Sequence, residues 1–324
     1  MKVQLPHPAP TLAEIQAARQ RLGTTALRTP LVRLSGDDLP AEIYLKLENL
    51  QPIGSFKLRG AGNAIAMATN AQLRNGVWTA SAGNMALGVA WHARRRGISC
   101  TVVVPDHAPR AKLDAIERLG AKIISVPFGE WWQILVTGKF EGLEGLFVHP
   151  VIDPAVIAGN GTIGLEILED LADVEAILVP YGGGGLVTGI GCALRALKPS
   201  ARLYACEVET AAPLAASLRA GVPTPAEYTP SFVDGIGGKT VLAEMWPVVK
   251  QLVDDSLVAS LAQVSAAIRL LVMRNRIVAE GAGAASVAAA LGGTAGKGKL
   301  VCIVSGGNID PAKLANILHG DVPS

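Results

Sequence analysis

The stretch AILVPYGGGGLVTGIGCALRALKPSARLYACEVE, residues 176–209, decides the fold of this chain. It begins and ends with apolar runs, 176–181 and 202–209, which are separated by four glycines and a segment of helical length. Continuous apolar runs are typical of strands that are buried on both faces. A strand, a helix and a second strand in this order predict a βαβ unit and hence a parallel sheet.

The same alternation extends in both directions from this stretch. Upstream, strands are expected at 77–81, 99–105 and 121–128, with helices at 84–97, 108–120 and 156–171. Downstream, a helix is expected over 261–276 and a strand over 299–305. The helices at 84–97 and 108–120 end in glycine, as left-handed C-terminal caps require. The pattern therefore predicts an α/β protein with mainly parallel sheets.

Composition and charge exclude several classes of protein. Lys and Arg total 29 against 27 acidic residues, and 29 − 27 gives a formal charge of +2, without the basic excess of nucleic-acid-binding proteins. Half of the residues are hydrophobic, which excludes a disordered chain. The uncharged stretch 176–194 contains a proline and four consecutive glycines, so we expect no membrane span there. The N-terminal sequence lacks the apolar segment of a signal peptide. The four cysteines, Cys100, Cys192, Cys206 and Cys302, form no CxxC pair, and we expect them to be free and buried. Free cysteines are typical of a reducing compartment, so a cytoplasmic protein is expected.

The four glycines Gly182–Gly185 predict a phosphate site. They lie between a predicted strand and a predicted helix, where backbone N–H groups and the helix dipole bind anions. A tight turn needs only one or two glycines. A dinucleotide fingerprint fails because Thr188 occupies its last glycine position, and the chain contains no P-loop motif. A single phosphate monoester remains as the expected guest.

Three other segments carry candidate chemistry. In GSFKLRG, Lys57 lies among small and apolar residues before a predicted helix, where desolvation can lower the pKa of an amine, although most lysines are simply exposed. In SAGNM, residues 81–85, a helix start offers N–H groups to a carboxylate, or Ser81 or Asn84 simply caps the helix. In VSGGNID, Ser305 follows the last predicted strand, where ligands of open α/β sheets bind, and Asp310 caps the final helix.

Together and in this order, GSFKLRG, SAGNM, GGGGL and SGGN resemble the pyridoxal-phosphate enzymes of fold type II, and most of all the serine/threonine dehydratases, or ammonia-lyases. The resemblance runs from about Arg28 to Asp310 and includes LKLENLQP and AGNGTIGLEI. It implies two open, mainly parallel twisted sheets with helices on both faces. It also implies a small lobe at 47–149, a large lobe from 1–46 and 150–324, and a homodimer. No C-terminal regulatory domain is expected, since 324 − 310 leaves 14 residues after Asp310.

The resemblance implies a role for each motif residue. Lys57 would be the catalytic lysine, covalently bound to pyridoxal 5′-phosphate. The cofactor-binding residues would be Phe56, Lys57, Asn84, Gly182, Gly183, Gly184, Gly185, Leu186 and Ser305. Asn84 would hydrogen-bond the 3′ oxygen of the cofactor, and Ser305 would face its pyridine nitrogen. The loop that receives the substrate carboxylate would be Ser81, Ala82, Gly83, Asn84 and Met85.

The implied activity is that of a lyase. Lys57 removes the α-proton of a β-hydroxy amino acid of the threonine or serine type, the β-hydroxyl leaves, and a 2-oxo acid and ammonia result. Two other reactions on the same scaffold, β-replacement and racemisation, are alternative activities. A phosphate-sensing module without enzymatic activity is a third alternative. Ala82 stands where racemases have a second serine, which argues against efficient racemisation.

Two departures from the family pattern bear on substrate and metal. Met85 and Leu87 replace the usual histidine and glutamine, so we expect a more apolar face and a bulkier substrate, such as phenylserine, with 3-hydroxyaspartate as another candidate. In the family's cation site, Glu207 and Ala211 match but Pro213 replaces a carboxylate, so no metal is expected.

The sequence leaves two possible positions open for each of two residues, Glu280 and His149. Glu280 faces the cofactor ring, as a similarly placed glutamate does in relatives, or lies at the surface. His149 lies near the cleft, or is a packed or capping histidine.

Overall fold

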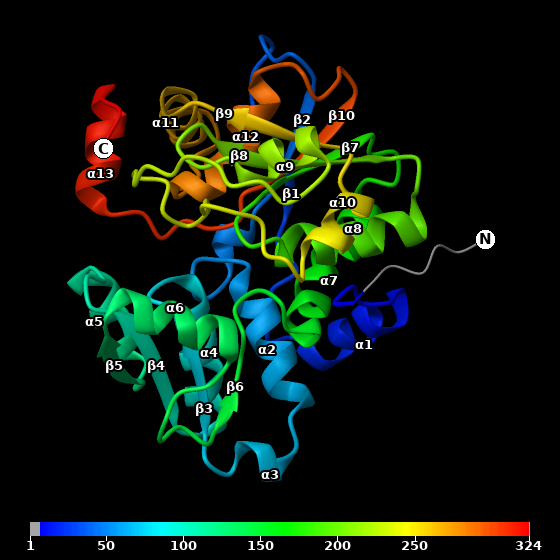
Figure 1. The fold of residues 1–324 in the computed structure, drawn as a ribbon. Helices are drawn as coiled ribbons and strands as arrows, with labels where there is room; N and C mark the ends of the chain where they lie inside the picture. Colours follow the sequence, from blue (N-terminus) through cyan, green and yellow to red (C-terminus); the bar gives the residue numbers. More distant parts are fainter. Residues whose placement is uncertain (1–6, 324) are drawn as a thin grey trace.

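The computed structural model describes residues 7–323 and contains two β-sheets with helices around them (Figure 1). The larger sheet has six strands in the order β1-β2-β10-β7-β8-β9. These strands are β1 Leu31–Arg33, β2 Glu42–Lys46, β7 Ala176–Pro180, β8 Arg202–Val208, β9 Asp255–Ala259 and β10 Lys299–Ile303. Strand β1 is antiparallel to β2, and all other neighbours are parallel. The prediction of a mainly parallel sheet is confirmed.

The smaller sheet is entirely parallel, with the order β5-β4-β3-β6. Its strands are β3 Val77–Ala80, β4 Cys100–Pro105, β5 Lys122–Val126 and β6 Leu146–Phe147. It lies below the larger sheet in the view of Figure 1. Around it are α2 Lys57–Met67, α3 Asn70–Leu73, α4 Asn84–Arg96, α5 Arg110–Arg118 and α6 Phe128–Thr137, whereas η1 Glu48–Leu50 follows β2 and hydrogen-bonds to Val304 after β10.

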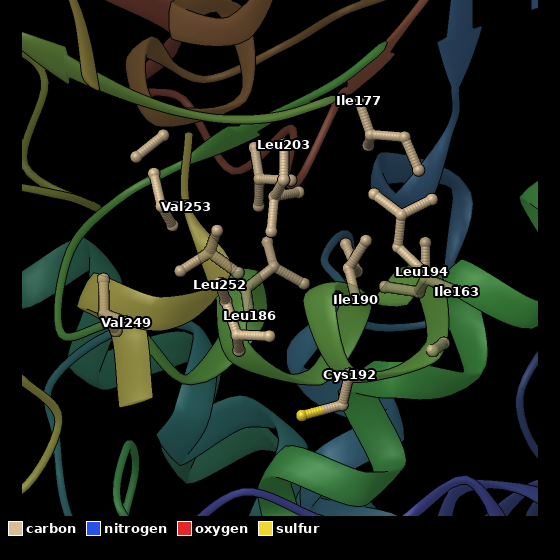
Figure 2. Close-up of a cluster of buried hydrophobic side chains, with 14 of the residues drawn as sticks. Ile163, Ile177, Leu186, Ile190, Cys192, Leu194, Leu203, Val249, Leu252 and Val253 are labelled. Carbon is tan, nitrogen blue, oxygen red and sulfur yellow. The ribbon is translucent and has the colours of Figure 1, made fainter. Parts of the chain in front are cut away.

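Alternate side chains of the central strands of the larger sheet enter two different cores. Ile177 and Val179 pack with helices α8 and α10 in one core, shown in Figure 2. Leu178 packs on the other face, with Cys302 of β10 and helices α11 and α12. This burial of both faces explains why the strand sequences are apolar throughout. The helices of this part are α1 Leu12–Leu22, α7 Pro154–Asp170, α8 Gly185–Leu197, α9 Pro213–Ala220, α10 Trp246–Leu252, α11 Leu261–Leu270, α12 Gly281–Leu291 and α13 Pro311–His319.

Several predicted helix ends are confirmed. Helix α4 ends at Gly97 in the left-handed conformation, and the carboxylate of Asp310 accepts hydrogen bonds from the first backbone N–H groups of α13. The helix expected over 261–276 changes at Leu271 into a π-helical turn that ends at Asn275. None of the helices in residues 7–323 is both long enough and apolar enough to cross a membrane.

Helix α2 connects the two sheets because it packs closely against α7. A Cβ atom at Gly60 would lie 2.7 Å from Val156 Cγ1, and one at Gly159 would lie 2.5 Å from the Arg59 carbonyl oxygen. Glycine is therefore required on both sides of this contact. The close packing fixes the position of Lys57, the first residue of α2.

Candidate active site

Lys57 begins α2 and its side chain is half-buried. Its Nζ donates a hydrogen bond to the carbonyl oxygen of Pro150 at 2.7 Å and lies 5.2 Å from the centre of the Phe56 ring. Burial lowers the pKa of this amine to about 8. Because a neutral carbonyl is its acceptor, no carboxylate opposes the effect of desolvation. Lys57 therefore has the lowered pKa that the sequence suggested.

Ser305 lies beside Lys57 through backbone contacts. The Phe56 N–H donates to the Ser305 carbonyl oxygen at 3.0 Å, and Ser55 forms an antiparallel bridge with Gly306. Ser305 follows the carboxyl end of β10 and is only 3% exposed. The GSFKLRG and SGGN segments are therefore neighbours in space.

The glycine loop connects β7 to the start of α8. Gly184 has a φ of +98°, which favours glycine, and a Cβ atom at Gly183 would lie 2.6 Å from Val151 Cγ2. A Cβ atom at Gly185 would lie 2.8 Å from the Val151 carbonyl oxygen. Within residues 7–323, no protein group accepts a hydrogen bond from the N–H groups of Gly182, Gly183 or Gly184. These donors at a helix N-terminus suit a phosphate. Leu186 follows them as a buried residue of α8.

Asn84, the first residue of α4, connects the two sides of the site. Its Nδ2 donates to Glu280 Oε1 at 2.8 Å, and its Oδ1 accepts from Asn308 Nδ2 at 2.7 Å. Glu280 is 8% exposed, so the surface interpretation of this residue is wrong. Burial, helped by Asp234, raises the pKa of Glu280 to about 7, although the Asn84 hydrogen bond opposes the rise. The carboxyl group is therefore partly protonated near neutral pH.

The remaining residues of the SAGNM loop lie between β3 and α4. The Gly83 N–H donates to Ser81 Oγ at 3.2 Å, and Ala82 packs against the core of the smaller sheet. Met85 is 1% exposed and belongs to that core, with Leu87 packed against it. A side chain in the core adds no apolar surface to the cleft. The expectation that Met85 and Leu87 make this face favour a bulkier substrate therefore loses its basis at Met85, whose substrate contact would use its backbone, while Leu87 is half-buried.

Glu207 is engaged in a structural contact. Its carboxylate accepts hydrogen bonds from the N–H groups of Leu214 and Ala215 in the first turn of α9, at 2.9 and 2.7 Å, and from Ser256 Oγ at 2.6 Å. Ala211 bridges back to Val208. Among residues 7–323, no three His, Cys, Asp or Glu side chains gather as metal ligands.

Sequence reasoning missed a buried charge cluster behind Lys57, formed by Lys46, Glu48, Arg59 and Glu166. Arg59 donates to both oxygens of Glu48 at 2.8 Å and to both oxygens of Glu166 at 2.6 and 2.9 Å. Lys46 donates to Glu166 at 2.6 Å. The signal was present in the sequence, because these charges lie inside segments that otherwise look buried, LKLENL, KLRG and GTIGLEI.

Lys57, the glycine loop, Asn84 and Ser305 thus surround one region of the structure. An amine of lowered pKa can form a covalent bond with a carbonyl compound. The free N–H groups of the glycine loop can hold a phosphate on that compound, and Asn84 and Ser305 offer polar groups to its other atoms. This set of donors fits pyridoxal phosphate.

Comparisons with known proteins agree with this chemistry. The model of the family described as pyridoxal-phosphate dependent enzyme matches residues 23–306. An L-threonine ammonia-lyase of Thermotoga maritima is 42% identical over 314 residues, which cover 95% of this chain and 78% of that protein. Among solved structures, maize serine racemase has a TM-score of 0.88 at 32% identity, covering 96% of this chain and 97% of that one. The processed form of threonine deaminase isoform 2 from Solanum lycopersicum has a TM-score of 0.86 at 30% identity, covering 98% of this chain and 93% of that one.

Proposed function

This chain belongs to the family of pyridoxal-phosphate-dependent enzymes, and we propose that Lys57 is the lysine through which it deaminates threonine or serine. The chain is a lyase of the threonine ammonia-lyase type, and pyridoxal phosphate is its cofactor. The observation that carries the assignment of Lys57 is the turn at Pro150 and Val151, because that turn contacts the Lys57 amine and the glycine loop together.

Lys57 would hold the cofactor covalently and would then act as the base. Both tasks need an uncharged amine, and a pKa of about 8 leaves a usable uncharged fraction near neutral pH. When bound, pyridoxal phosphate supplies an electron sink that makes the α-proton of an amino acid removable. Lys57 Nζ would accept that proton.

The other predicted residues would bind and orient. Gly182–Gly185 and Leu186 would hold the phosphate through backbone N–H groups, with Phe56 beside the bound lysine. Asn84 would donate to the 3′ oxygen of the cofactor, and Ser305 would face the ring nitrogen as a neutral hydroxyl. The loop 81–85 would bind the substrate carboxylate through its N–H groups at the start of α4.

The net reaction is balanced without an external reagent. A β-hydroxy amino acid loses water to give an enamine, which takes up water and releases ammonia, leaving a 2-oxo acid. Ala82 carries no group that can transfer a proton, which supports elimination over racemisation. Because Met85 points into the core, we propose threonine and serine rather than phenylserine or 3-hydroxyaspartate as substrates.

Assays for 2-oxo acid and for the absorbance of the bound cofactor test this proposal. Lys57→Ala should lose the chromophore and about a thousandfold or more of the activity. Lys297→Ala is the matched control, since Lys297 is exposed and lies just before β10, at the end of that strand opposite to Ser305. Borohydride reduction of the wild type should label Lys57. Labelling of another lysine, or a substitution product from an activated serine without any 2-oxo acid, would contradict the proposal.

A substrate panel and two physical measurements test the finer proposals. Comparing kcat/KM for threonine, serine, 3-hydroxyaspartate and phenylserine measures discrimination in the transition state directly. Light scattering should give twice the chain mass of 33.5 kDa if the enzyme is a homodimer. We also propose a small lobe at 47–149, and a cytoplasmic location that agrees with four free, buried cysteines. Limited proteolysis near residues 47 and 149 would test the lobe boundaries.

A further inference from the structure

We propose that His149 is a positioning residue that holds the turn Pro150–Ile152, on which both Lys57 and the glycine loop rest. This proposal deepens the proposed function, since it depends on Lys57 being the cofactor lysine. His149 lies between β6 and α7, and its side chain is half-buried. Among the described residues, its hydrogen-bond partners are Leu135, Val151 and Ile152, so it acts through the turn.

The imidazole makes three hydrogen bonds that fix its protonation state. Nδ1 accepts from the N–H groups of Val151 at 3.0 Å and Ile152 at 3.1 Å. Nε2 lies 3.1 Å from the Leu135 carbonyl oxygen in α6 and must donate to it. Only the neutral ring with its hydrogen on Nε2 satisfies all three contacts. Burial favours this form, because it lowers the pKa of His149 to about 4.

The turn that His149 holds has two neighbours in the site. The Pro150 carbonyl oxygen accepts the hydrogen bond from Lys57 Nζ at 2.7 Å. The next residue, Val151, lies against the glycine loop so closely that a Cβ atom at Gly183 or Gly185 would come within 2.8 Å of it. A displacement of the turn would therefore move the acceptor of Lys57 and one wall of the glycine loop together.

Hydrogen bonds to other parts of the backbone hold the two ends of this segment. On one side, the Val148 N–H donates to the Trp78 carbonyl oxygen in β3. On the other, Asp153 accepts from the Ala155 N–H and caps α7. In residues 7–323, the N–H groups of Val151 and Ile152 have no acceptor other than Nδ1 of His149. This one nitrogen is therefore the acceptor for both N–H groups in the middle of the turn, whose side chains Val151 and Ile152 also pack against the core.

Two isosteric variants separate the functions of the two ring nitrogens. In His149→Asn, the amide oxygen occupies the position of Nδ1 and can still accept from the turn, while the contact with Leu135 is lost. In His149→Gln, the longer side chain reaches toward Leu135 but leaves the turn without its acceptor. His107→Gln is the matched control, because His107 is an exposed histidine beside Asp106.

Kinetics and amide hydrogen exchange together test the proposal. We expect His149→Gln to lower kcat by about tenfold to a hundredfold, as a small misplacement of reacting groups does. It should also weaken cofactor binding and speed exchange of the Val151 and Ile152 amides. His149→Asn should keep most of kcat, and exchange at these two amides should stay as slow as in the wild type. His107→Gln should match the wild type in every measurement.

The exchange measurement uses the holoenzyme without substrate, so it reports on the turn even if the enzyme proves to act on another amino acid. The proposal is overturned if folded His149→Gln keeps wild-type kcat and exchange. It is also overturned if folded His149→Asn is impaired as severely as His149→Gln. If His149→Gln fails to fold, the result for His149→Asn decides alone: retained activity supports the proposal and a hundredfold loss refutes it.

Discussion

Replacing Arg59 by methionine should strongly destabilise the protein while leaving its surface unchanged. Arg59 is 1% exposed and forms two-pronged hydrogen bonds with both Glu48 and Glu166. The buried cluster of Lys46, Glu48, Arg59 and Glu166 has two positive and two negative charges, so it is neutral as a whole. In the variant, Lys46 is the one remaining positive charge of the cluster for the two carboxylates. Lys46 is hydrogen-bonded to Glu166 but not to Glu48, so Glu48 loses its cationic partner.

The expected loss is about 3–5 kcal/mol of unfolding free energy, the usual cost of leaving one partner of a buried ion pair uncompensated. Methionine fills much of the volume of the arginine stem, so this cost comes mainly from charge and not from a cavity. Because single domains unfold with about 5–15 kcal/mol, the loss would remove a large fraction of the stability.

The loss should also depend on pH. Burial is the largest influence on Glu48 and would raise its pKa, but Arg59, with smaller contributions from Thr29 and Lys46, holds that pKa below its usual range. In the wild type this pairing therefore stabilises the protein above the unfolded-state pKa, and the contribution disappears as pH falls through the lower native pKa. In the variant, the largest opposition to burial is gone and only Thr29 and Lys46 remain, so ionisation of the Glu48 carboxyl group destabilises the native state as pH rises. The difference between the two proteins should be larger near pH 8 than near pH 5.

Urea unfolding followed by circular dichroism at both pH values measures this difference. Arg110→Met is the matched control, because the side chain of Arg110 is 69% exposed and its ion pairs with Asp114 and Glu117 should contribute less than about 1 kcal/mol. Adding Glu48→Gln to Arg59→Met should recover part of the loss. A loss below about 1 kcal/mol, or an equal loss at both pH values, would refute the reasoning.

Three further predictions concern the site and the cores. Burial raises the pKa of Glu280 to about 7, so this carboxyl group binds a proton more tightly in the native than in the unfolded protein. The free energy of unfolding should therefore fall as pH rises from about 5 to 8. Urea unfolding of Glu280→Gln should show a fall that is smaller by about 3 kcal/mol. Gly184→Ala should weaken cofactor binding about tenfold in a titration of the chromophore, because φ is +98° there, whereas Gly221→Ala, at φ +74° and in open space, should bind normally. Burial raises the thiol pKa of Cys100 and Cys192 to about 12, so a thiol reagent should react with them at pH 8 only after unfolding.

The sequence predicted the strands that are continuous apolar runs and missed β2 and β9, whose sequences contain charged or polar residues. β7, β8 and β10 are continuous apolar runs because helices cover both sides of the sheet centre. β2, with the sequence EIYLK, pairs with β10 more than 250 residues away, and its buried Lys46 is compensated by hydrogen bonds to Glu166 and to the Thr29 carbonyl oxygen. β9, with the sequence DSLVA, lies at the sheet edge, where Asp255 and Val258 are exposed and the apolar run is only three residues long.

The candidate site shows a similar division. Special residue types in the sequence marked Lys57, the glycine loop and Ser305 as candidates, and the structure brings these segments together. The Pro150 carbonyl and the Val151 backbone were not found, because every residue carries these groups and only the fold brings them to Lys57. Met85 was assigned to the cleft from its place in a motif, but the first turn of α4 directs its side chain into the core.

The arrangement of charges around Lys57 explains how a lysine keeps a low pKa two residues from a cluster that contains two carboxylates. A carboxylate beside Nζ would stabilise the ammonium form and raise the pKa. Here Glu48 and Glu166 each receive two hydrogen bonds from Arg59, and Lys46 binds Glu166 as well. The negative charges of the two carboxylates are therefore compensated within the cluster and not by Lys57. The acceptor left for Nζ is a carbonyl, which binds the amine without adding charge. The cluster can therefore anchor α2 through strong ionic contacts while desolvation alone sets the pKa of its first residue. An anchor of carboxylates without Arg59 and Lys46 would have the opposite effect and would keep Lys57 protonated.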